Sequence, residues 1–147
     1  YVTVPSGQSV TFNTYVRQSG LIHFDVKLTS GTSSGDIKFN NVLENVGSHY
    51  STSTGRFTAP VAGVYHFAGT VLQNNSGSQF DVNLRYNNSS NVKGNSMRAT
   101  FTGHSTIQIS ETLKMNANDY VHINVSSGSL HHDSSGAWCG FQGTLLG

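Results

Sequence analysis

The sequence predicts an all-β fold, an antiparallel sandwich or jelly roll, and three observations lead to this prediction. Apolar and polar residues alternate with a period of two in several runs, and no stretch keeps the period of a helix. Clusters of Gly, Asn and Ser separate these runs at short spacing, as in sandwiches and barrels. With 147 residues, the chain has the length of one domain with its own core.

The runs that we expect to form strands begin after residue 20. Alternation is clear in residues 21–28, 80–86, 107–109 and 120–125. In the first run the apolar face consists of Ile22, Phe24, Val26 and Leu28. The polar positions His23, His66 and His122 are expected to point outward, because such alternation is typical of strands with one buried and one wet face.

Two parts are expected along the chain. Residues 1–20 are predicted to form an N-terminal arm, extended or folded as a hairpin, and residues 21–147 the globular domain. The sequence begins with Tyr1 and not with Met, so we expect a mature or trimmed form, as removal of a signal peptide would leave.

A specific motif lies between residues 39 and 67. Its positions are Phe39, Asn45, Tyr50, Phe57, Gly63, Tyr65 and Phe67. Their spacing resembles the signature of the complement component 1q globular-head family, and residues 141–146 resemble the family's closing strand. Gly69 and Thr144 stand where the family has aromatic residues. At Gly69 we expect either a gap that another side chain fills or a close approach of the backbone.

The resemblance implies a ten-stranded antiparallel jelly roll of the tumour-necrosis-factor type over residues 21–147, usually assembled as a homotrimer. The chain has neither the Gly-X-Y period of a collagen stem nor a heptad run. It is therefore similar to stemless, secreted, head-only members that occur in invertebrates and act as soluble pattern-recognition lectins. The expected function is binding of glycans or microbial surface molecules outside the cell. The alternative is an extracellular matrix or structural protein, or a protein-ligand module.

Composition and motifs weigh against other classes of function. A net charge of +1 does not suit a nucleic-acid binder, which neutralises several phosphates. No apolar run approaches the roughly 20 residues that cross a bilayer, so membrane insertion is not expected. No Gly-x-Ser-x-Gly lies between a strand and a helix, and the carboxylates are dispersed. We therefore expect no enzymatic activity and no required cofactor.

Candidate ligand-binding residues lie in predicted loops, where aromatic rings, amides and acids could match sugar hydroxyls. The preferred contact is the loop 129–136, with His131, His132 and Asp133; the second is the loop 86–95. The further candidates are Tyr86, Asn87, Asn88, Asn91 and His104. The alternative is ordinary turn chemistry. Trp138 is expected in the core or an interface more than as a sugar platform.

Four further features of the sequence concern metal binding, N-glycosylation, the histidines and the single cysteine. His131, His132 and Asp133 could chelate a metal, whereas calcium, which some relatives bind near the trimer axis, is possible but unassigned. Acceptor patterns for N-glycosylation in a secreted protein occur at Asn74, Asn87, Asn88 and Asn124. The seven histidines suit a polar surface or a subunit contact, with a pH-sensitive oligomer as the alternative. Cys139, the single cysteine, is expected as a buried thiol, with an intermolecular disulfide as the alternative.

Overall fold

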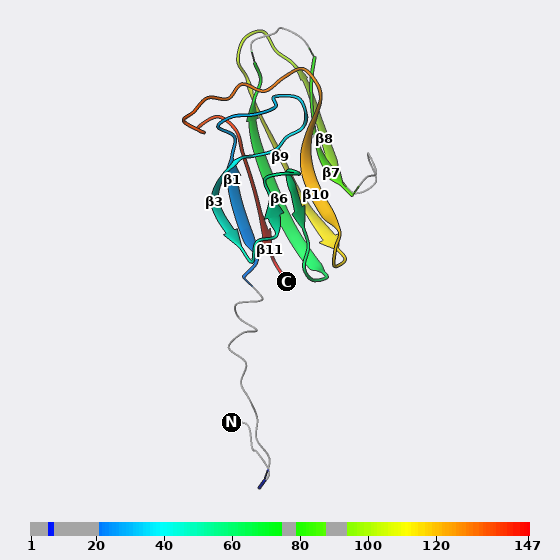
Figure 1. The fold of residues 1–147 in the computed structure, drawn as a ribbon. Coiled ribbons are helices and arrows are strands. Elements are labelled where there is room, and N and C mark those ends of the chain that lie inside the picture. Colours follow the sequence, from blue (N-terminus) through cyan, green and yellow to red (C-terminus); the bar gives the residue numbers. More distant parts are fainter. Residues whose placement is uncertain (1–5, 8–20, 75–78, 88–93) are drawn as a thin grey trace.

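The computed structural model describes residues 6–7, 21–74, 79–87 and 94–147, and within them the chain forms a sandwich of two antiparallel sheets (Figure 1). One sheet has five strands in the order β3-β1-β11-β6-β9, and the other has the order β4-β5-β10-β7-β8, with β2 paired to β10. The strands are β1 (His23–Lys27), β2 (Gly35–Asp36), β3 (Asn41–Val46), β4 (Tyr50–Ser51), β5 (Arg56–Thr58), β6 (Gly63–Leu72), β7 (Gln79–Tyr86), β8 (Asn95–Thr100), β9 (Thr106–Met115), β10 (Tyr120–Ser127) and β11 (Gly140–Leu145).

The all-β jelly roll predicted from the sequence is confirmed. The described residues form eleven strands where the resemblance implies ten, and two of these, β2 and β4, have only two residues each. No helix occurs in this part of the chain, so none of it forms a helix long and apolar enough to cross a membrane.

The predicted alternation decides which face of each strand enters the core. In β1, Phe24 and Val26 are fully buried, while the polar residues that alternate with them are half-buried. In β6, Tyr65, Phe67 and Val71 are also fully buried, and His66 on the opposite side is exposed. The two sheets therefore meet through one apolar layer, and each keeps a second face on the outside.

Aromatic rings fill the centre of this layer. Phe24 packs against Phe57 and Phe141, with ring centroids 4.9 Å apart in both pairs, and Phe57 lies 5.5 Å from Phe67. Offset and edge-to-face pairs of this kind contribute about 0.5–1.5 kcal/mol each beyond the area they bury. The aromatic positions of the sequence motif thus form the contact between the sheets.

The polar members of the motif connect backbone segments around this core. The Asn45 amide donates to the Tyr50 carbonyl at 2.9 Å and accepts from the Tyr50 backbone N–H at 3.0 Å. The Tyr50 hydroxyl donates to the Phe39 carbonyl at 3.1 Å, and the Tyr65 hydroxyl to the Val61 carbonyl at 2.7 Å. Because Asn45 belongs to β3 and Tyr50 to β4, these bonds join the two sheets across a tight turn.

Two glycines mark places where the core leaves no room for a side chain. A Cβ at Gly69 would lie 3.2 Å from side-chain atoms of both Ile109 and Ile123. Of the two alternatives for this departure from the family pattern, the structure shows the first, a gap filled by other side chains. At Gly143 a Cβ would come within 2.5 Å of both Phe24 and Phe67, so only glycine lets β11 pass these rings.

The outer face of β10 is less exposed than expected. His122 occupies an outward-facing position, as predicted, but only 4% of it is exposed, and Asn124 is exposed by 6%. The side chain does project from the outer face, yet neighbouring side chains cover it. Tyr120 stacks on its ring and the Asp36 carboxylate lies 3.2 Å from its Nε2. Of the other two predicted outward positions, His66 is exposed and His23 half-buried.

Candidate functional site

The preferred loop lies between β10 and β11 and crosses the end of the sandwich that is farthest from the C-terminus (Figure 1). It meets the connection between β8 and β9 there. The ring centroids of His104 and His131 lie 4.8 Å apart, and those of His131 and Trp138 lie 6.3 Å apart. His104 is fixed by its Nδ1, which donates to the Gln73 carbonyl at 3.1 Å. The structure thus brings two predicted histidines together with the tryptophan, and we call this group the loop-end cluster.

Asp133 orients the indole of the loop-end cluster. Its Oδ2 accepts the Trp138 Nε1–H at 2.8 Å, and its Oδ1 accepts the backbone N–H of Ser135 at 2.9 Å and the Ser135 hydroxyl. The Ser135 hydroxyl and the indole N–H, together with that backbone N–H, hold the pKa of the Asp133 carboxyl below its usual range. Asp133 is therefore ionised at neutral pH, and Trp138 is held by a charge-assisted bond while 44% of it stays exposed.

His132 does not join the cluster. Its Nε2 donates to the Gly31 carbonyl at 3.2 Å, whereas the ring of its neighbour His131 packs on Trp138. The two imidazoles therefore do not form a chelating pair, in contrast to one alternative from the sequence. Within residues 21–74, 79–87 and 94–147, no group of three or more His, Cys, Asp or Glu side chains is arranged to hold a metal ion.

The second predicted loop begins at the other end of β10. Tyr86 pairs with Val121 at the start of β10, and His131 follows the other end of that strand, which is about 20 Å away at the usual rise per residue. The Tyr86 hydroxyl donates to Asp119, and the Asn87 amide connects Asp119 Oδ1, at 3.0 Å, to the Tyr120 N–H, at 2.8 Å. These contacts build the turn around Asp119.

The ligand-binding roles predicted for Tyr86 and Asn87 are therefore corrected. Tyr86 is only 7% exposed, and burial together with the Asp119 carboxylate raises its pKa to about 12. Both sides of the Asn87 amide are occupied by protein groups. Asn88 and Asn91, the other candidates of this loop, lie outside the described residues.

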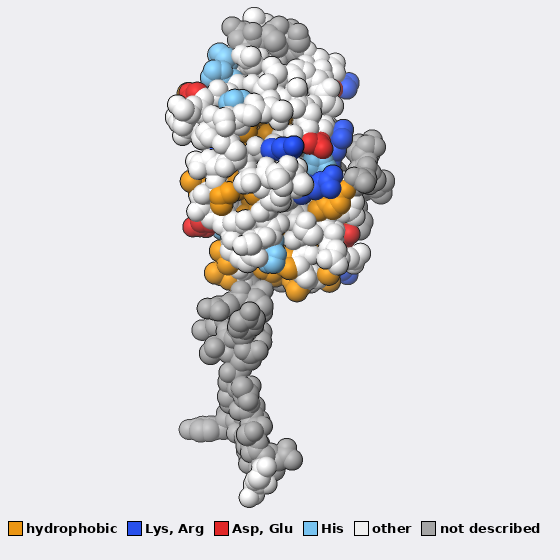
Figure 2. Space-filling model, in the orientation of Figure 1, with side chains coloured by type: hydrophobic (Ala, Val, Ile, Leu, Met, Phe, Trp, Pro, Cys, Tyr) orange, Lys and Arg blue, Asp and Glu red, His pale blue; other side chains and the backbone are white. Residues whose placement is uncertain are grey.

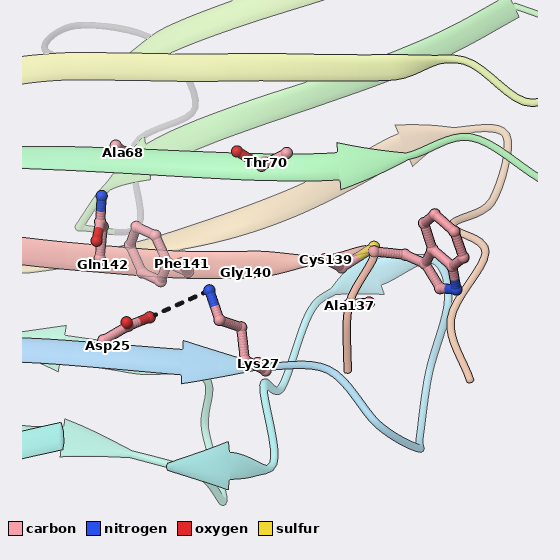
Figure 3. Close-up of a pocket in the computed structure, with 10 residues that line it drawn as sticks. Asp25, Lys27, Ala68, Thr70, Ala137, Cys139, Gly140, Phe141 and Gln142 are labelled. Atoms are coloured by element: carbon pink, nitrogen blue, oxygen red, sulfur yellow. Dashed lines mark ion pairs between the residues drawn. The ribbon is translucent and has the colours of Figure 1, made fainter. Parts of the chain in front are cut away.

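A shallow hollow of about 280 Å³ lies on the outer face of the five-stranded sheet (Figure 3). Its floor comes from β11 and β6, where Ala68 and Gly140 are small. Lys27 and Asp25 of β1 form an ion pair at its side, with Nζ and Oδ1 3.4 Å apart (Figure 3). Trp138 also lines the hollow. The hollow thus continues from the loop-end cluster onto the sheet.

The predicted glycosylation positions differ in their surroundings. Asn74 is exposed. Asn124 is buried, and its amide nitrogen donates to Asp36 Oδ1 at 2.6 Å, so a glycan on that nitrogen has no path to the solvent. The prediction at Asn124 is therefore wrong for the folded chain. The amide nitrogen of Asn87 also donates within the fold, and Asn88 lies outside the described residues.

Cys139 is a free, buried thiol, as the favoured interpretation predicts. The thiol donates to the His131 carbonyl at 3.2 Å, and the Leu72 N–H lies 3.5 Å from the sulfur. Burial raises its pKa, which keeps it protonated and unreactive. Its role is to join the loop-end cluster to β6.

Sequence analysis missed the exposure of Trp138 and its contact with Asp133. An Asp five residues before a Trp carries no general signal, since the bond depends on the turn at Ser135. The contact between His104 and His131 joins two loops that are distant in the chain, and only the strand order brings them together.

Comparison with known proteins agrees with this fold. The model of the C1q domain family matches residues 22–146. Complement C1q tumor necrosis factor-related protein 3 of Homo sapiens is 32% identical over 124 residues, which cover 80% of this chain and 46% of that protein. The protein of the same name from Mus musculus is 32% identical over 123 residues, with the same coverage. The chain therefore spans about half the length of these curated relatives.

Solved structures show the same architecture. The globular domain of zebrafish complement 1qA protein superposes with a TM-score of 0.67 at 19% identity, covering 86% of this chain and 98% of that one. The structure of Eiger TNF from S. frugiperda gives a TM-score of 0.66 at 12% identity, with coverages of 87% and 94%. These likenesses show the jelly roll that C1q and TNF proteins share. Since the family model spans residues 22–146, the chain belongs to the C1q domain family.

Proposed function

We propose that this chain is a non-catalytic, extracellular recognition head that binds glycans or microbial surface molecules as a homotrimer. C1q domains typically form trimers and act in recognition or signalling, and the family is generally non-enzymatic. The proposed contact is the loop-end cluster, His104, His131 and Trp138, together with Asp133, which orients the indole.

The exposed and oriented indole of Trp138 carries this proposal. Its N–H is held by Asp133 and its edge by His131, while 44% of the residue remains open to solvent. An amphipathic ring held in one orientation can cover the apolar face of a sugar ring. The Asp133 carboxylate beside it keeps further capacity to accept hydrogen bonds from sugar hydroxyls.

The interaction of one head with one sugar is expected to be weak. Each sugar hydroxyl exchanges bonds with water for bonds with protein, at a net gain of roughly 0.5–1.5 kcal/mol. Three heads on one rigid trimer would raise the avidity by roughly 10²–10⁴-fold where the target repeats at a matching spacing. A dense microbial glycan coat provides such repeats, whereas a free monosaccharide does not.

The outer face of the five-stranded sheet is the proposed contact between subunits. Its centre presents small and neutral side chains, among them Ala68, Thr70 and Gln142, around the shallow hollow. The buried core of a protein interface is likewise poor in charged residues. Lys27 and Asp25, which line this hollow, form an ion pair and so neutralise each other.

Glycan binding is tested with immobilised microbial polysaccharides and a glycan array. The parent trimer should bind multivalent glycans, and Trp138→Ala should weaken this binding about tenfold or more, since stacking and the orienting bond are both lost. Replacement of His131, His132 and Asp133 together by Ala should weaken it as well. Leu21→Ala is the control, because Leu21 is 62% exposed and belongs to neither proposed contact.

Two results would contradict the proposal in different ways. If Trp138→Ala and the triple variant bind as the parent does, the site is wrong. If the parent binds no glycan, the lectin function is wrong.

One observation favours the alternative, a protein-ligand or structural module. The edge strand β3 exposes Val42, Leu43 and Val46 by 41%, 54% and 37%. An exposed apolar edge suits contact with another protein. The alternative would be supported if the parent retains a protein partner, Leu43→Asp loses it and Trp138→Ala retains it.

A further inference from the structure

A row of three basic side chains crosses the outer face of the six-stranded sheet. His122 on β10 pairs directly with Arg85 on β7. On the other side of β10, Val121 pairs with Phe57, which places Arg56 of β5 beside His122. All three side chains point away from the core, because the residues next to them in each strand are buried in it. Figure 2 shows Lys and Arg side chains gathered with a histidine and an acid over β10.

The two arginines of this row have no carboxylate partner among the described residues. Arg98, on the same face of the sheet, forms two bonds to Asp81, at 2.8 and 3.0 Å. No such pair forms for Arg56 or Arg85 in the part of the chain that the structure describes. The Arg56 guanidinium instead lies 4.2 Å above the ring of Tyr120, which holds it over β10. The strands of Arg56 and Arg85 flank β10, so the two like charges lie on either side of it, and an anion between them would reduce their repulsion.

Two buried polar atoms in the row have no hydrogen-bond partner within the described residues. They are Nδ1 of His122 and Nε of Arg85. His122 is 4% exposed, and its other nitrogen faces Asp36 Oδ1 at 3.2 Å. Asp36 is itself held by the Asn124 amide at 2.6 Å. A buried polar atom that bonds to nothing is rare in folded proteins. The Arg85 Nε–H lacks an acceptor, and Nδ1 of His122 lacks one when the imidazole is protonated.

We propose that Arg56, His122 and Arg85 bind an oxyanion, the sulfate or carboxylate group of an acidic saccharide. A groove of about 330 Å³ lies farther along the same sheet, lined by Asn83, Ser96 and Ser126, by Met97 and by the ion pair of Asp81 with Arg98. Asn83 lies two positions before Arg85, on the same face of β7, so the groove adjoins the row. Its amide and hydroxyl groups suit the neutral part of a sugar. This site does not depend on the loop-end cluster.

The protonation of His122 couples this site to pH. Neutral His122 donates from Nε2 to Asp36, which leaves Nδ1 as an acceptor that does not suit an anion. Protonated His122 donates from both nitrogens. Burial, together with Arg56 of β5 and Arg85 of β7, lowers the pKa of His122 against the opposing effect of Asp36 of β2. The ring of Tyr120 packs on the imidazole. An anion beside Nδ1 favours the charged form, so binding takes up a proton and strengthens as the pH falls.

The test is a titration of the parent with sodium sulfate, with chloride adjusted to constant ionic strength, followed by NMR of the arginine Nε–H and imidazole signals. We expect saturable shifts at Arg56, Arg85 and His122, and a dissociation constant about threefold or more lower near pH 5.5 than near pH 7.5. In His122→Gln the pH dependence should vanish.

Three variants separate this site from general charge effects. Arg85→Gln should lose the saturable shifts, and Arg56→Gln provides the same test should Arg85→Gln fail to fold. Lys114→Gln is the matched control: it removes the same charge from β9 on the other sheet and should bind sulfate as the parent does. Trp138→Ala should also bind sulfate normally, so failure of the loop-end proposal leaves this one unaffected. Sulfate that shifts these signals no more than chloride does, or that binds both arginine variants like the parent, would overturn the site.

The source of the anion is separated by comparing inorganic sulfate, a sulfated disaccharide and the same disaccharide without sulfate. A sulfated disaccharide that binds about tenfold or more tightly than inorganic sulfate would support an acidic saccharide, because the groove adds contacts. If the sulfated disaccharide and inorganic sulfate bind with equal affinity, the proposal of a saccharide ligand is wrong and the site binds a free oxyanion.

Discussion

The two outer faces of the sandwich differ although both cover the same aromatic core. The face of the five-stranded sheet presents small neutral residues such as Ala68 and Gly140 around a shallow hollow. The face of the six-stranded sheet carries the row of Arg56, His122 and Arg85, in which two buried nitrogens have no hydrogen-bond partner among the described residues. The alternation of each strand fixes its inner face and leaves the outer face free to vary. One outer face therefore suits another copy of the chain, and the other suits a charged ligand.

The largest expected effect comes from breaking the core that supports both faces. Phe141 packs on Phe24 at 4.9 Å and on Phe39 at 5.8 Å. Phe141→Ala should lower the free energy of unfolding by about 3–5 kcal/mol, through lost burial and the cavity that remains. Denaturant unfolding measures this, with Trp138→Ala as the exposed aromatic control. A loss below about 1 kcal/mol would contradict the packing described.

The next effect should be confined to the face of the five-stranded sheet. Ala68→Arg places a long charged side chain in the hollow and should prevent subunit association. Light scattering should then give the mass of one chain, 15.8 kDa, where the parent gives three. Ser96→Arg on the outer face of the other sheet is the matched control and should keep the parent's mass. Association of Ala68→Arg like that of the parent would exclude this face as the interface.

A smaller effect is expected where the two sheets are joined. Asn45→Ala removes both bonds to the Tyr50 backbone and should lower the free energy of unfolding by about 1–3 kcal/mol. Glu44→Ala, at the next position of β3, removes only an exposed carboxylate that faces His23 and should change it by less than about 0.5 kcal/mol. Equal effects of the two variants in denaturant unfolding would contradict the role given to Asn45.

The smallest effect concerns the acid sensitivity of the face of the six-stranded sheet. The pKa of His122 in the folded chain is lowered, chiefly by burial, so the unfolded chain binds the proton more readily. Its stabilising contribution is complete above the unfolded pKa of about 6.5 and is lost as the pH falls through the folded pKa. In His122→Gln the melting temperature should therefore fall less between neutral pH and pH 5 than in the parent. His66→Gln, at an exposed position of the other sheet, should keep the parent's slope.

Much of the fold could be predicted from the sequence because the inner face of each strand depends on residues that are close together in the chain. The alternation predicts that Phe24 and Phe67 lie in the core, where the structure has them. The sequence motif contains both Asn45 and Tyr50, which are joined by two hydrogen bonds in the structure. The alternation of residues 80–86 also put Tyr86 on the buried face, so its assignment as a ligand residue conflicted with the pattern that predicted its strand. Strands as short as β2 and β4 have no periodicity to detect.

The two proposed binding sites could not be predicted in the same way, because their geometry depends on contacts that no periodic pattern reports. The alternation in β10 gives the correct side for His122. Its burial, however, depends on Asp36 and Arg85, which the strand order brings from distant parts of the chain. The exposure of Trp138 likewise depends on the bond to Asp133 and on the turn at Ser135. Sequence patterns report which side of a strand a residue occupies, and not what covers that side.

The position of β1 has a consequence for how the chain folds during synthesis. β1 pairs with β11 along its whole length, from His23 with Thr144 to Lys27 with Gly140. A ribosome therefore releases the partner of the first strand only after nearly all of the domain has been made. Until then β1 can pair only with β3, and the edges of β1 and β6 that β11 occupies stay unpaired. The nascent chain must stay open and protected from aggregation, and then complete its five-stranded sheet in one late step.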